Sequence, residues 1–169
     1  LIGNKIRNFD LSQVKSLNVA YLSSNKMKEI KLDNPNLWNL DLSNNDLESI
    51  DLEKLPALEQ LWLNANKLTK VDVSKNSKLA VLNVVGNRLK FSTMPLPINN
   101  GKSFNKYSYN LQAPIDVKCI DGKVDLSSEA IVGNEPTTYR WFIGNVKSVD
   151  GTLQGEELTV NDEYTVQNG

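Results

Sequence analysis

Acid–base chemistry in this chain of 169 residues would have to rest on carboxylates, lysines or tyrosines, because the sequence contains no histidine. Histidine is the commonest general base and the commonest neutral metal ligand of proteins. Asp41 and Glu59 are candidates for a pair of catalytic carboxylates of the kind that glycoside hydrolysis uses. Such a pair needs an enclosing pocket that shifts a carboxyl pKa, and the pattern described below places both residues on an open polar sheet. We expect solvated surface acids and no catalytic residue.

Metal binding has one weak candidate. The run from Asp41 to Glu53 has the acidic and amide residues of a calcium loop, but it lacks the glycine that makes the sharp turn. Leu42 and Leu47 of this run also fall on expected core positions. We expect no bound metal and no cofactor.

Asparagine recurs along the first half of the chain at spacings of 21, 20, 21 and 21 residues, at Asn4, Asn25, Asn45, Asn66 and Asn87. Each is part of the pattern L-x-x-L-x-L-x-x-N-x-L, whose clearest copy is Leu58 to Leu68. A fixed period of this length predicts a solenoid. An amide both donates and accepts, so we expect these five asparagines to bond backbone groups of their own turn and of the adjacent coil.

Each repeat also carries a second apolar pair two residues apart, such as Phe9 with Leu11 and Val71 with Val73. This alternation predicts short strands or 3-10 turns on the convex side of each coil. The period stops after Lys90, and Met94 to Pro97 is stiff and turn-forming. We therefore place a domain boundary between residues 94 and 95.

These repeats resemble the short leucine-rich repeats of internalin-type bacterial cell-surface proteins, over Leu1 to about Leu89. The resemblance implies a β-rich, curved, right-handed solenoid with a parallel sheet on its concave side. Leu1 falls inside a repeat, so we expect the natural protein to extend further at its N-terminus.

Residues 95–169 have short β-rich runs between turn signals. We expect strands at Tyr107–Leu111, Ile115–Ile120, Thr137–Ile143, Glu157–Val160 and Tyr164–Val166. The runs TTYRWFIGN and DEYTVQNG resemble the immunoglobulin-like modules that follow leucine-rich repeats in secreted bacterial proteins. The resemblance implies a β-sandwich with Trp141 in its core, and the chain stops where two further strands would be expected. The single Cys119 is either a buried thiol or bonded to a partner beyond Gly169.

The concave strands expose the side chains between and beside the leucines. The middle column is Tyr21, Asp41, Trp62 and Asn83, flanked by Val19, Asn39, Gln60 and Val81 on one side and by Ser23, Ser43, Asn64 and Val85 on the other. Aromatic rings among amides and hydroxyls suit a docking face for a protein or a glycan. The alternative is that a neighbouring domain or a lattice contact covers Trp62. Trp38, at the leading edge of its strand, fits partly buried packing better than ligand contact.

The net charge of −1 excludes the basic field that nucleic-acid binding requires, and no apolar run approaches the length of a membrane span. The leading hypothesis is a non-enzymatic extracellular recognition or adhesion module at a bacterial cell surface, which binds a protein or glycan through the concave repeat face. The alternatives are a structural spacer of a surface protein and the non-catalytic part of a larger carbohydrate-processing enzyme.

Overall fold

The computed structural model describes residues 1–99 and 101–113 and, beyond them, residues 119–120, 123–124, 129, 131–132, 135–136, 141–149 and 152–158. The chain divides into two compact units, Leu1–Ile115 and Asp116–Gly169. Each unit is described by itself.

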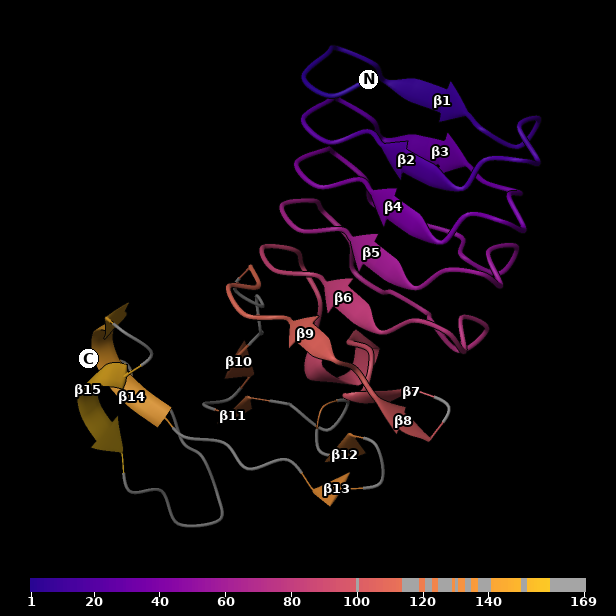
Figure 1. The fold of residues 1–169 in the computed structure, drawn as a ribbon. Helices are drawn as coiled ribbons and strands as arrows, with labels where there is room; N and C mark the ends of the chain where they lie inside the picture. Colours follow the sequence, from indigo (N-terminus) through magenta and orange to yellow (C-terminus); the bar gives the residue numbers. More distant parts are fainter. Residues whose placement is uncertain are drawn as a thin grey trace. The chain divides into compact units, whose positions relative to one another are not determined.

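The first unit is a stack of coils, five of which each contribute one short strand to a parallel sheet (Figure 1). In order across the sheet the strands are β2 (Val19–Tyr21), β4 (Asn39–Asp41), β5 (Gln60–Trp62), β6 (Val81–Asn83) and β9 (Lys106–Ser108). The central residue of each strand points into the coil, and its neighbours point outward. Parallel strands that follow one another around a coil without a helix make a solenoid.

A second, two-stranded parallel sheet joins β1 (Asn8–Asp10) to β3 (Glu29–Lys31), with Phe9 opposite Ile30. Phe9 and Ile30 are the first residues of the second apolar pair in the first two repeats, so the expected extended backbone is confirmed there. The corresponding segments 50–52 and 71–73 are not strands. The 3-10 helix η1 (Phe91–Thr93) follows the fifth coil.

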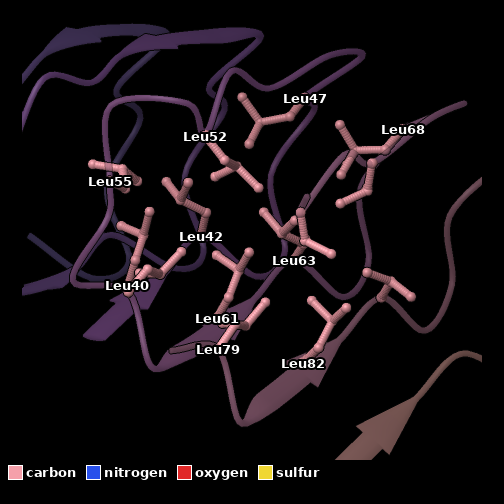
Figure 2. Packing of buried hydrophobic residues seen from close by; sticks show 14 of the residues in the cluster. Leu40, Leu42, Leu47, Leu52, Leu55, Leu61, Leu63, Leu68, Leu79 and Leu82 are labelled. Atoms are coloured by element: carbon pink, nitrogen blue, oxygen red, sulfur yellow. The ribbon is translucent and has the colours of Figure 1, made fainter. Parts of the chain in front are cut away.

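The core is a continuous column of leucines inside the coils (Figure 2). Leu40, Leu61 and Leu82 come from the centres of adjacent strands and have no exposed surface. Full burial of one such side chain stabilises a fold by about 1.5–3 kcal/mol. Each layer of leucines packs against the layers above and below it, so the stability of the unit comes from stacking of the coils.

The repeats continue past the boundary expected after residue 94. Strand β9 pairs with β6, with Tyr107 opposite Leu82, and the first compact unit runs to Ile115. Tyr107 and Gln112 stand where the earlier coils have leucine and asparagine, and the step from Asn87 to Gln112 is 25 residues. The hairpin of β7 (Ile98–Asn99) and β8 (Lys102–Ser103) lies within this longer coil. The strand expected at Tyr107–Leu111 therefore belongs to the repeat sheet and is shorter, because Leu111 turns into a left-handed conformation at φ 55°.

In the second unit the described strands form three antiparallel pairs. They are β10 (Cys119–Ile120) with β11 (Lys123–Val124), β12 (Ile131–Val132) with β13 (Glu135–Pro136), and β14 (Trp141–Val149) with β15 (Thr152–Leu158). Strand β14 begins inside the expected strand 137–143, and the expected strand 164–166 lies outside the described residues. Among the described residues each pair is a separate two-stranded sheet, so the immunoglobulin-like module stays a prediction.

Candidate binding surface

The register of the sheet brings the predicted surface residues into columns. Tyr21, Asp41, Trp62 and Asn83 are direct neighbours across β2, β4, β5 and β6, and Val19, Asn39, Gln60 and Val81 form the parallel column. Adjacent strands of a sheet lie about 4.8 Å apart. We call these two columns, with Ser23, Ser43, Asn64 and Val85 just after the strands, the sheet face.

The sheet face exposes its aromatic side chains to different degrees. Tyr21 is 49% exposed, and Trp62 is half-buried between its neighbours. Asp41, Gln60, Asn64 and Asn83 are also half-buried. Trp38, which precedes β4, is 37% exposed, so part of its ring surface is open to solvent as well as packed.

Short hydrogen bonds fix the end of β4 and the end of β6. Asp41 Oδ1 accepts from the backbone N of Ser43 at 2.9 Å and from its Oγ at 2.6 Å. Asn83 Oδ1 accepts from the backbone N of Val85 at 3.1 Å. These turns hold both side chains at set positions on the sheet face. The side chains of Asp41 and Asn83 therefore lose less conformational freedom when a partner binds.

Asn39 and Ser23 are the buried residues of the sheet face, and Asn39 is the more buried, at 5% exposed. Its Nδ2 lies 3.4 Å from the hydroxyl of Tyr21, and its Oδ1 has no hydrogen-bond partner among the described residues. A buried acceptor without a partner costs about 1–3 kcal/mol. The orphaned oxygen is therefore a destabilising feature within the predicted surface.

Four of the five repeat asparagines are buried at equivalent positions of successive coils: Asn25, Asn45, Asn66 and Asn87. Asn66 is typical, since its Nδ2 donates at 3.0 Å both to Leu63 O in its own turn and to Leu42 O in the preceding coil. Its Oδ1 accepts from Leu47 N at 3.0 Å. Asn4 is exposed and donates only to Leu1 O and Ile2 O within its own turn.

Backbone geometry repeats along with these asparagines. The residue before each amide has a positive φ, at Gly3, Ser24, Asn44, Ala65, Gly86 and Leu111. The last of these precedes Gln112, whose Nε2 donates to Val84 O at 2.9 Å and whose Oε1 accepts from Leu89 N at 3.0 Å. Gln112 thus has the role that asparagine has in the earlier coils.

Sequence reasoning missed Gln112 and also a second set of buried amides. Asn34 and Asn76 are completely buried, and Nδ2 of each donates to two carbonyl groups of the preceding coil. Two signals were available. Asn76 follows Asn34 by two repeat lengths, and Tyr107, Tyr109 and Gln112 have the spacing of Leu82, Val84 and Asn87.

The pKa shifts of the described carboxyl groups do not favour acid–base catalysis. Four carboxyl groups have a pKa below the ordinary 3.8 because each accepts a hydrogen bond: Asp10 from Ser12, Asp33 from Lys15, Asp46 from Lys67 and Asp72 from Ser74. A lowered pKa keeps a carboxyl group ionised, whereas a general acid needs a raised one. Within the described part of the chain, no group of three potential ligand residues is placed to hold a metal ion.

Comparison with known proteins agrees with this architecture. A family model described as leucine-rich repeats in two copies matches residues 35–76. The chain carries leucine-rich repeats, in agreement with the resemblance of its sequence pattern. No curated protein sequence matches closely enough to count as a relative.

In the part of the chain that the structure describes, no helix is long and apolar enough to cross a membrane.

One similar solved structure is the functional domain of InlJ from Listeria monocytogenes, an internalin, which is described as including a cysteine ladder. The two chains are 30% identical and superpose with a TM-score of 0.56, over 66% of this chain and 25% of that one. This chain thus spans about a quarter of the InlJ chain. The only cysteine of the present chain, Cys119, lies beyond the repeats. Asparagine side chains bond the coils of this chain to one another.

Proposed function

We propose that the chain is a non-enzymatic, extracellular recognition module of a bacterial surface protein, and that its sheet face binds a protein or glycan partner. The observation that carries the proposal is the row Tyr21, Asp41, Trp62 and Asn83. These side chains are held in register on one sheet and point away from the leucine core. Aromatic rings beside fixed polar groups are typical of binding hot spots.

Two further observations support a binding role. The coils are held together by buried leucines and asparagines, so the sheet face is free of that structural task. The similarity to the repeat structure of an internalin supports a cell-surface setting.

The proposal is tested by selecting binders to the immobilised chain from a phage-displayed random peptide library. We expect the selected peptides to bind at least about tenfold more weakly to the double variant Tyr21→Ala with Trp62→Ala, because aromatic anchors dominate such interfaces. The matched control is Phe91→Ala, which removes an exposed aromatic ring of η1 outside the sheet face.

Circular dichroism establishes that both variants fold. A double variant that binds the selected peptides as tightly as the parent contradicts the proposal. A chain that selects no peptide above background and binds nothing on a glycan array also contradicts it and favours a structural spacer.

A further inference from the structure

Asp41 is the one side chain with a formal charge on the sheet face; the other eleven positions carry neutral side chains. Both hydrogen bonds from Ser43 go to its Oδ1. The second carboxylate oxygen is thus open to a donor from outside, and no cation is paired with it among the described residues. The sheet face therefore presents a single fixed negative charge. The next charged residue in its columns is Lys106 on β9, beside Val81 and three strands away from β4.

Aromatic side chains stand on both sides of this carboxylate. Tyr21 and Trp62 are the register neighbours of Asp41 on β2 and β5. One strand spacing of about 4.8 Å separates Asp41 from each of them, and a cation is attracted by an aromatic ring within about 6 Å of its centroid. A cation above Asp41 would thus be within reach of the carboxylate and of both rings.

The accessible uncommitted polar atom of Asp41 is a hydrogen-bond acceptor, its second carboxylate oxygen. Oδ1 of Asn39, two residues earlier on β4, also lacks a donor, but it is buried and out of reach of a partner. A sugar hydroxyl both donates and accepts, whereas a guanidinium group only donates, through five N–H groups in a planar fork. That plane also stacks on aromatic rings. The carboxylate of Asp41 and the aromatic rings beside it are therefore complementary to arginine.

We propose that the sheet face takes an arginine side chain of a protein partner, with its guanidinium group over Asp41 between Tyr21 and Trp62. The proposal rests on the proposed function and narrows its partner from a protein or glycan to a protein with an exposed arginine.

The test compares two acetylated and amidated pentapeptides, Gly-Gly-Arg-Gly-Gly and the same peptide with citrulline in place of arginine. Citrulline has nearly the same shape but no charge. Nuclear magnetic resonance of the full chain follows the indole N–H signals of Trp38 and Trp62 during titration. We expect the arginine peptide to shift the Trp62 signal, with an affinity at least about tenfold above that of the citrulline peptide and weaker at high salt.

Asp41→Asn removes the charge, and asparagine fits the position because Asn83 makes the same turn in the same column. The matched control is Asp10→Asn on β1, where Asp10 Oδ1 accepts from Ser12 N at 2.9 Å and from its Oγ at 2.6 Å, as Asp41 does from Ser43. We expect Asp41→Asn to abolish the preference for arginine over citrulline and Asp10→Asn to keep it.

Equal shifts with the two peptides would overturn the arginine site, and so would equal effects of the two variants. The proposed function would survive that result if library-selected peptides still lost affinity for the Tyr21→Ala, Trp62→Ala double variant. Failure of both experiments would remove the proposed function as well.

Discussion

At the scale of single residues, the amide side chain decides how the coils hold together. Asn66 bonds three backbone groups, two of them in the preceding coil, and Asn25, Asn45 and Asn87 repeat the arrangement. A hydroxyl is too short for this geometry, and a carboxylate has no donor for the two carbonyl groups. The periodic asparagine is therefore a requirement of the stacked backbone.

Leucine has as many side-chain heavy atoms as asparagine, but in Asn66→Leu the backbone N of Leu47 loses its acceptor. Leu42 O and Leu63 O each lose one of two donors and keep the other, from Asn45 Nδ2 and from Asn87 Nδ2. An unpaired buried donor costs about 1–3 kcal/mol, so we expect the free energy of unfolding measured with urea to fall by at least that amount. Asn4→Leu is the matched control, because exposed Asn4 bonds only its own turn and water replaces those bonds. Equal losses in the two variants would show that the bonds between coils contribute nothing.

At the scale of elements, the strands of the first unit follow from the leucine pattern, but the last one does not. The L-x-L spacing places β2, β4, β5 and β6 at their observed positions. Strand β9 escaped the pattern because its inward residue is Tyr107 and its amide is Gln112, four residues later than a regular repeat would place it. Both residues are longer than leucine and asparagine, so they fill the same positions from a longer coil.

Tyr107 anchors this last coil through its hydroxyl, which donates to Pro95 O at 2.6 Å. Its ring packs against the core and lies 5.1 Å from Phe104 and 5.0 Å from Tyr109, between ring centroids. We expect Tyr107→Phe to lower the free energy of unfolding by about 1 kcal/mol, because Pro95 O loses its donor. Urea denaturation followed by tryptophan fluorescence measures it.

Tyr109→Phe is the matched control, since that side chain is half exposed and water can replace any bond that its hydroxyl makes. A loss as large in Tyr109→Phe as in Tyr107→Phe would mean that the bond to Pro95 does not hold the last coil in place.

At the scale of the whole molecule, the sequence predicts the coils of the solenoid better than the residue at which the repeat unit ends. Leucine burial and asparagine spacing are local, repeated signals, and so the coils and the columns of the sheet face could be read from residue positions. The burial of Asn39 beneath Tyr21 could not, because it depends on how two neighbouring coils pack. The amides of Asn34 and Asn76 were missed because Leu55 interrupts their column.

The central claim is that the sheet face binds the partner, and side-chain footprinting with hydroxyl radicals tests it most directly. Radical oxidation is measured by mass spectrometry for each aromatic residue, with and without a library-selected peptide. We expect the bound peptide to protect Tyr21 and Trp62 from oxidation, while the exposed ring of Phe91 is oxidised as before. Protection of Phe91 with no change at Tyr21 and Trp62 would place the binding surface elsewhere and contradict the claim.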